Sequence, residues 1–306
     1  MRMLIWPLLV VFVLTAVWVV LRSFTTAPPD VNSAIQAIHR DGNTPWRAAI
    51  LLEALRQPSG IEMRADPAMA RRVSELLEHE LDNGSGEESA TTRTYLCRAL
   101  AQFEVDDGLP VLLRVVKKQT DEDQADERRT AIEAVASLTR HIESRRLATA
   151  NRDLIPSLLE AADSPNSQVR AAAAYALGVF SAGDMPTLES DIASARAKLR
   201  ILLHDVFADV RYNAATGLAR SGNAACEEVL LEMLDPRESA ASDPKSQETI
   251  LLSALAASEQ LLQKNPNLDT RRIKKAVTRL SEGNSDVSPE ARRRAGELIE
   301  RWSESK

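Results

Sequence analysis

The chain has 306 residues, of which 44% are hydrophobic and 27% are charged, as in an ordinary folded protein. Alanine occurs 44 times, glycine occurs 11 times, and only 4% of the residues are aromatic, so the composition favours helices over sheets. The net charge of −6 argues against a general nucleic-acid binder. Two cysteines are too few for a disulfide framework or a four-thiolate zinc site.

The first segment has the properties of a membrane span. The run from Met3 to Leu21 contains no charged residue, and as a helix it would be about 28 Å long, close to the ~30 Å hydrocarbon core of a bilayer. Trp6 and Trp18 lie near its two ends, where indole rings favour the membrane interface. We therefore expect a transmembrane anchor and short linker over 1–27, followed by a repeat domain over 28–306.

A cleaved signal peptide is the alternative explanation of this segment. The apolar run is longer than a usual signal core, and the best cleavage site, at Ala27, lies beyond Arg22 and Phe24 in an unfavourable context. The α-amine and Arg2 precede the run and only Arg22 follows it closely, which favours an outward-facing repeat domain. In a bacterium this predicts a single-pass inner-membrane protein with a periplasmic repeat domain. Cleavage would instead give an exported soluble repeat protein.

The rest of the chain contains an internal repeat. Segments 169–178 and 210–219 align without gaps at a period of 41 residues. They share a Val-Arg pair, two alanines and a leucine at spacings that place these residues along one helical stripe. Weaker copies begin at Arg93 and Arg128. The small alanines would let a neighbouring helix approach closely, and the leucines would fill the interface.

A second helix precedes each copy. The segments 109–113 and 155–159 are near duplicates with proline in the first turn of the expected helix, where its missing N–H costs nothing. Turns that carry aspartate separate the helices, and aspartate is a good N-cap. One such pair cannot bury its apolar face alone, whereas a stack can. We expect seven helix-turn-helix units, at 31–57, 67–103, 108–142, 150–182, 188–221, 224–263 and 268–303, with surface loops at 82–90 and 235–246.

These repeats resemble the HEAT family, in the short variant also found in phycobilisome lyases. The resemblance rests on an Asp…Val-Arg-x-x-Ala-Ala-x-x-Leu pattern around 163–178 and 205–219. It implies a right-handed α-solenoid. The expected fold is therefore all-α, with about six to seven helix-turn-helix repeats and one N-terminal transmembrane helix. In the family, a turn aspartate and a helix arginine often link adjacent repeats, and the positions that match them here are Asp163, Arg170, Asp209 and Arg211.

The sequence contains no recognisable catalytic constellation. The four histidines, His39, His79, His141 and His204, have neither metal-site nor catalytic spacing. Cys97 occupies a core position of its helix, and Cys226 stands beside two glutamates that would raise the pKa of its thiol. Phosphate-binding and nucleophile-elbow motifs are also missing from the sequence. We expect no enzymatic activity, cofactor, metal site or small-molecule substrate.

The last unit is basic. Residues 265–306 contain ten Lys or Arg and seven Asp or Glu. One interpretation is a polar terminal cap, which every solenoid needs. The other is a docking patch for an acidic partner or for anionic lipid headgroups, made of Arg271, Arg272, Lys274, Lys275, Arg292, Arg293 and Arg294.

Repeat architecture without a catalytic site favours a membrane-anchored scaffold that binds an unidentified protein on its concave face. Two alternatives follow from the resemblance. The same repeat variant occurs in lyases that attach bilins to proteins, and some DNA glycosylases use a HEAT-like solenoid. An acidic chain with a membrane anchor argues against nucleic acid as a partner.

The full-length protein should sediment with membranes and keep residues 1–21 in its mature form, because the apolar run is long enough to span a bilayer. Fractionation followed by N-terminal sequencing measures both properties. Protease added to cells whose outer membrane has been removed, with the inner membrane intact, should digest the repeat domain. A mature N-terminus at Pro28 would contradict the anchor. Digestion only after the cytoplasmic side is opened would contradict the orientation.

Overall fold

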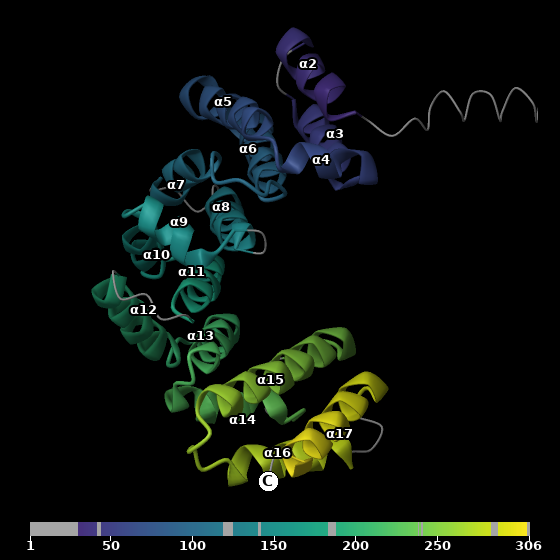
Figure 1. Ribbon diagram of the computed structural model, residues 1–306, viewed down its shortest axis with the longest axis vertical. Coiled ribbons are helices and arrows are strands. Elements are labelled where there is room, and N and C mark those ends of the chain that lie inside the picture. Colours follow the sequence, from purple (N-terminus) through teal and green to yellow (C-terminus); the bar gives the residue numbers. More distant parts are fainter. Residues whose placement is uncertain are drawn as a thin grey trace, which may run out of the picture.

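The computed structural model describes residues 30–41, 44–118, 125–139, 142–182, 188–237, 239, 241–282 and 287–304. Every regular element in these ranges is helical. The helices pair in chain order and the pairs stack into an open arc (Figure 1). The expected membrane span at 3–21 lies outside the described ranges. Within them, no helix combines the length and apolar character that crossing a membrane requires.

Each of the seven expected units contains one helix pair. The pairs are α2 (Val31–Asp41) with α3 (Pro45–Arg56), α5 (Pro67–Asn83) with α6 (Gly86–Leu100), α7 (Leu109–Lys117) with α8 (Ala125–Leu138), α10 (Leu154–Ala161) with α11 (Ser167–Phe180), α12 (Glu189–Leu202) with α13 (Ala208–Arg220), α14 (Glu227–Leu234) with α15 (Pro244–Lys264), and α16 (Arg271–Ser281) with α17 (Pro289–Glu304). Short helical segments connect some pairs: η1 (Pro58–Gly60), α4 (Ile61–Arg64), α9 (Ser144–Ala150) and η4 (Ala224–Cys226).

The two helices of a pair lie on different sides of the arc. In its middle part, α8, α11 and α13 line the inner side, and α7, α10 and α12 form the outer side (Figure 1). One apolar cluster of buried residues continues through all seven pairs. Each helix therefore buries its apolar stripe against its own partner and the adjacent pairs, as in other repeat proteins.

Side-chain caps explain where several helices begin. The carboxamide oxygen of Asn166 accepts hydrogen bonds from the amides of Gln168 and Val169 at 2.9 and 3.2 Å. The carboxylate of Asp243 accepts from two amides in the first turn of α15, at 2.9 and 3.0 Å. These bonds satisfy amides that have no partner within the helix.

The two expected surface loops, at 82–90 and 235–246, are shorter in the structure, and the prediction of a loop over all of 82–90 is wrong. α5 continues to Asn83, and α6 begins at Gly86. Gly86 takes a φ of +77°, which glycine adopts without strain. The two glutamates that follow it favour a helix start, because their charge opposes the partial positive charge of the N-terminus. The loop after α14 similarly ends at Asp243.

α11 and α13 approach each other closely where two glycines meet. A Cβ atom added to Gly178 would lie 2.5 Å from the Cα of Gly217, and one added to Gly217 would lie 2.8 Å from the Cα of Gly178. Both obstacles are backbone atoms, so no side-chain rotation could relieve the overlap. The packing of these two repeats depends on the absence of a side chain at both positions.

Overpacking by Gly178→Ala or Gly217→Ala should cost about 1–3 kcal/mol, and the higher helix propensity of alanine offsets ~1 kcal/mol of it. Each variant should therefore lower the free energy of unfolding by up to about 2 kcal/mol. Urea unfolding of the purified variants measures the difference. Gly296→Ala is the control. No atom lies within 4 Å of its added Cβ, so that variant should gain about 0.5–1 kcal/mol. Stabilisation at all three positions would contradict the close approach.

Candidate functional site

An arginine in α11 connects its own repeat to the next one. Arg170 donates from Nε and Nη2 to the carboxylate of Asp205, in the turn before α13, at 2.8 and 3.0 Å. Its Nη1 donates to the backbone carbonyls of Ser164 and Pro165, both at 2.9 Å. One planar guanidinium therefore closes the turn of its own repeat and holds the turn of the following repeat.

Arg211 repeats this arrangement in α13. Its Nη1 donates to the carbonyls of Asp205 and Val206 at 3.0 and 3.3 Å, which lie 41 residues after the two carbonyls that Arg170 uses. Its Nη2 donates to Glu232 of α14 at 2.6 Å. The hydroxyl of Tyr212 donates to the same Glu232 oxygen at 2.9 Å. The link from this repeat to the next is thus a three-residue cluster.

A buried version of the link joins α6 to α8. Arg93 Nε donates to Glu127 Oε1 at 2.7 Å, and the two side chains are only 5% and 2% exposed. Arg93 also donates to the hydroxyl of Ser89 at 2.8 Å. Arg128, the corresponding residue of the next repeat, donates to the carbonyl of Val116 at 2.8 Å. Burial lowers the pKa of Arg128. The internal repeat of the sequence located both arginines, but it did not mark Glu127 as the partner of Arg93.

The two aspartates expected to complete these links lie elsewhere. Asp163 accepts from Lys198 Nζ of α12 at 2.7 and 2.8 Å, so it joins a different inter-repeat pair. Asp209 is exposed in the first turn of α13. The acid that reaches Arg170 is Asp205, four residues earlier in the same turn. The repeated pattern identified the arginines, but the positions of their partners depend on the path of each turn.

The link at Asp205 changes the titration of its carboxyl group. Hydrogen bonds from Arg170 hold the pKa of Asp205 below its usual value, against the opposing effect of burial. The amide of Phe207 donates to the same carboxylate at 2.9 Å and lowers the pKa further. The charged form of Asp205 is therefore favoured by the folded state.

The basic residues of the last unit mostly pair with acids. Arg272 of α16 donates to both oxygens of Glu228 in α14 at 2.5 and 3.0 Å. Arg294 of α17 donates to Glu259 in α15 at 3.0 Å. In the rest of the expected patch, Arg271 pairs with Asp269 and Arg293 pairs with Glu290. The Lys274 ammonium lies over the Trp302 ring. Arg292 is half-buried and Lys275 is exposed. The pairs of Arg272 and Arg294 bind the last repeat to its neighbour, and those of Arg271 and Arg293 lie within the last repeat. Most of this charge is thus compensated internally, which favours the terminal-cap interpretation.

The described histidine and cysteine side chains are not brought together. His79 and His204 are exposed on different repeats, and the side chains of the other two histidines lie outside the described residues. Burial raises the pKa of the Cys97 thiol, and it raises that of Cys226 to about 12. Among the described residues, no group of three or more His, Cys, Asp or Glu is placed to hold a metal ion.

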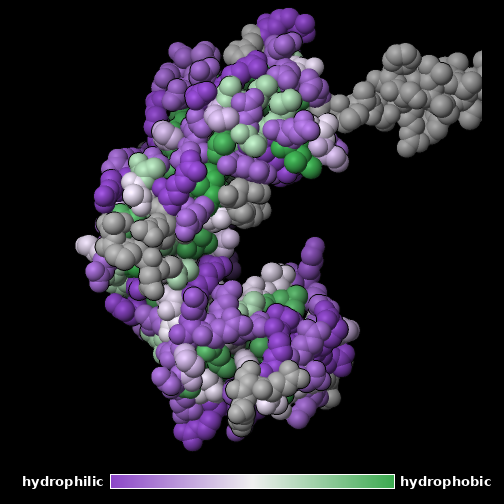
Figure 2. Space-filling view, viewed as in Figure 1, coloured by the Kyte–Doolittle hydropathy of each residue, from purple (hydrophilic) through white to green (hydrophobic). Residues whose placement is uncertain are grey.

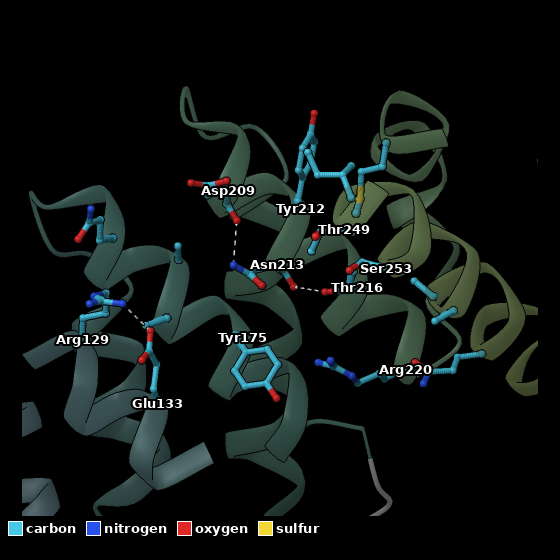
Figure 3. A pocket seen from close by; sticks show the side chains of 18 of the residues that line it. Arg129, Glu133, Tyr175, Asp209, Tyr212, Asn213, Thr216, Arg220, Thr249 and Ser253 are labelled. Atoms are coloured by element: carbon cyan, nitrogen blue, oxygen red, sulfur yellow. Dashed lines mark hydrogen bonds and ion pairs between the residues drawn. The ribbon is translucent and has the colours of Figure 1, made fainter. Parts of the chain in front are cut away.

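A pocket of about 790 Å³ lies on the inner side of the arc, across α8, α11, α13 and α15 (Figure 3). We call it the inner pocket. Figure 2 shows that the arc is hollowed on this side and that hydrophobic residues reach the surface in small separate patches. Small and polar side chains make up much of the lining, including Gln168, Ala172, Tyr175, Asn213, Thr216, Ser253 and Gln260.

Two arginines of the inner pocket are held differently. Arg129 forms ion pairs with Glu133 at 3.0 Å and Asp126 at 3.3 Å, within its own helix. The guanidinium of Arg220 lies 5.2 Å from the ring centroid of Tyr175, on the neighbouring α11. The sequence patterns do not predict the pocket, although the residues of α13 that line it recur at helical spacing.

Comparisons with known proteins agree with this architecture. Residues 74–178 match the family model of HEAT repeats, and residues 210–236 match that of the PBS lyase HEAT-like repeat. The two matches support the HEAT family. No curated protein matches the chain.

A solved complex shares the fold of this chain. The chain is similar to the complex of CpcE and CpcF of phycocyanin lyase from Nostoc, with 17% identity, a TM-score of 0.54, and coverage of 89% of this chain and 94% of that one. A computationally designed armadillo repeat protein for modular peptide recognition is also similar, with 17% identity, a TM-score of 0.45, and coverage of 84% and 98%. At these identities the similarity concerns the fold alone.

Arg170→Gln should lower the free energy of unfolding by about 1–3 kcal/mol at pH 7, because it removes charge-assisted hydrogen bonds. The pKa of Asp205 is depressed in the folded state, so this stabilisation is present above the unfolded pKa of about 4 and is lost as the pH falls through the folded value. The difference between variant and wild type should therefore shrink below about pH 4.

Urea unfolding at several pH values measures this difference. Arg114→Gln is the control, since its 2.7 Å pair with Asp82 is about half exposed on both sides and should contribute about 0–1 kcal/mol. An equal loss at every pH would contradict the role assigned to Asp205.

Proposed function

We propose that the protein is a HEAT-repeat scaffold that binds another protein in its inner pocket. The observation that carries this proposal is a single pocket of about 790 Å³ formed by inner helices of four successive repeats. Such a surface offers hydrogen-bonding groups from several elements at once, which suits a polypeptide bound among them. The assignment rests on this surface, because the fold alone does not determine the function.

We also propose that residues 3–21 tether the scaffold to a membrane. The support is the length and uniform apolar character of this run, together with the tryptophans near its ends. The proposed arrangement places the repeat domain on the periplasmic side of a bacterial inner membrane. A tether of this kind would confine the inner pocket to partners near the bilayer.

Site-specific photocrosslinking in native membranes tests protein binding. A benzophenone amino acid at Ser253, which lines the inner pocket, should give discrete crosslinked species that mass spectrometry identifies as one or a few proteins. The same group at Ser194, exposed on the outer helix α12, should not give them. Identical crosslinks from both positions, or none from Ser253, would overturn the proposal.

A bilin-lyase-like activity is the second candidate function. Its support is the match to the PBS lyase HEAT-like repeat and the shared fold with the phycocyanin lyase complex. Coexpression with a phycocyanin apoprotein and a linear tetrapyrrole would test it. A coloured covalent adduct on the apoprotein, above the level without this chain, would favour the enzyme. Its absence would favour the scaffold.

A further inference from the structure

The inner face of α13 carries a polar stripe. Asp209, Asn213, Thr216 and Arg220 all line the inner pocket, at positions i, i+4, i+7 and i+11 of one helix. This spacing places them on a single face, with the first and last residues about 16 Å apart along the helix axis. Figure 3 shows the two charged residues towards opposite ends, with Asn213 and Thr216 between them.

The positive end of this stripe lacks a counter-charge. No described residue forms a hydrogen bond or an ion pair with Arg220, and its Nη1 atom is buried without a partner. Burial lowers the pKa of Arg220, because removing the charged guanidinium from water costs free energy in the folded state. The guanidinium lies over the ring of Tyr175, 5.2 Å from the ring centroid. The Arg220 side chain as a whole is only half-buried and lines the pocket, so an incoming carboxylate would reach it there and supply a counter-charge.

The negative end is also open. Asp209 is exposed, and its carboxylate forms no ion pair with any residue in the described ranges. The remaining charges of the pocket, Arg129 and Glu133, already pair with each other at 3.0 Å. The pocket therefore presents two separated, uncompensated charges of opposite sign.

Neutral side chains occupy the space between these charges. Asn213 Nδ2 donates to the carbonyl of Asp209 at 3.0 Å, which leaves its carboxamide oxygen available to accept a hydrogen bond. Gln168, Ser253 and Gln260 add donors and acceptors from α11 and α15. Such groups can pair with the backbone of an extended chain, whereas a helix has already satisfied its own backbone. At about 3.3 Å per extended residue, 16 Å corresponds to about five residues.

We propose that the inner pocket binds an extended segment of a partner protein. The segment carries an acidic side chain that binds Arg220 and a basic side chain that binds Asp209, about five residues apart. This inference rests on the proposed scaffold function and specifies the chemistry of its partner. For a segment of given charge order, charge complementarity fixes the direction in which the segment lies along α13.

Helix stability alone could also place these two charges, since an acid at the N-terminus and a base at the C-terminus oppose the helix dipole. The outer helix α12 has the same arrangement, with Asp191 in its first turn and Arg200 in its last. Neither residue lines the inner pocket. The pair in α12 is therefore a matched control for the pair in α13.

A synthetic library of fluorescent nonapeptides tests the proposal with the full chain in detergent. Lys and Glu are fixed five residues apart in either order, and the other positions vary among Ala, Ser, Asn and Leu. A third library replaces both charges with Gln. Fluorescence anisotropy should show that peptides of at least one charge order bind about tenfold or more tightly than the neutral library. Asp209→Asn and Arg220→Gln should each abolish this preference, whereas Asp191→Asn and Arg200→Gln should retain it.

A charge reversal separates direct contact from a structural effect. Arg220→Glu should reject the preferred peptides and bind those in which Lys replaces their Glu. Equal binding of charged and neutral libraries, no binding of any library, or failure of this rescue would overturn the inference. If Ser253 still crosslinks a protein in membranes, the scaffold function stands without the inferred partner chemistry. If it crosslinks none, both proposals fail.

Discussion

The architecture depends on how an arginine of the second helix joins one repeat to the next. A helix pair that stacks on its neighbours through apolar faces alone has no polar contact that fixes its register. Arg170 supplies one by donating to two carbonyls of its own turn and to Asp205 of the following turn. Arg93 makes a buried equivalent with Glu127. A guanidinium suits this role because its five donors are fixed in one plane and can serve two repeats simultaneously.

The same packing shapes the candidate binding surface. Gly178 and Gly217 let the backbones of α11 and α13 come close, and an added Cβ at Gly178 would lie 3.3 Å from Arg220 Nη1. The glycine contact therefore also sets where Arg220 lies relative to Tyr175, at one end of the inner pocket. Stability and the proposed recognition are coupled here, because a side chain at Gly178 would displace both the helix and the cation. The outer helices α7, α10 and α12 contribute no residue to the lining of this pocket.

The C-terminal end and the middle of the arc differ in what they offer a partner. At the C-terminal end, arginines that looked available in the sequence are used internally, since Arg272 and Arg294 join α16 and α17 to the preceding repeat. A high density of basic residues is thus compatible with little free charge. In the middle of the arc the opposite holds. The inner pocket contains few charges, and Arg220 and Asp209 among them have no ionic partner in the described residues, so their effect on a bound segment would be large.

The sequence alone determined the helical class, the paired units and the arginines that recur in them, because each follows from local periodicity and a fixed repeat length. It also contained the polar stripe of α13, whose spacing is visible at residues 209 to 220. Tertiary structure decided which acids these arginines meet. Arg170 and Arg211 pair with Asp205 and Glu232 instead of Asp163 and Asp209. The reason is the path of the backbone through each turn, which the periodicity of the sequence does not encode. It also decided that Gly178 faces Gly217 and that Arg220 lacks an acid, since both facts depend on how far one helix is rotated and shifted against another.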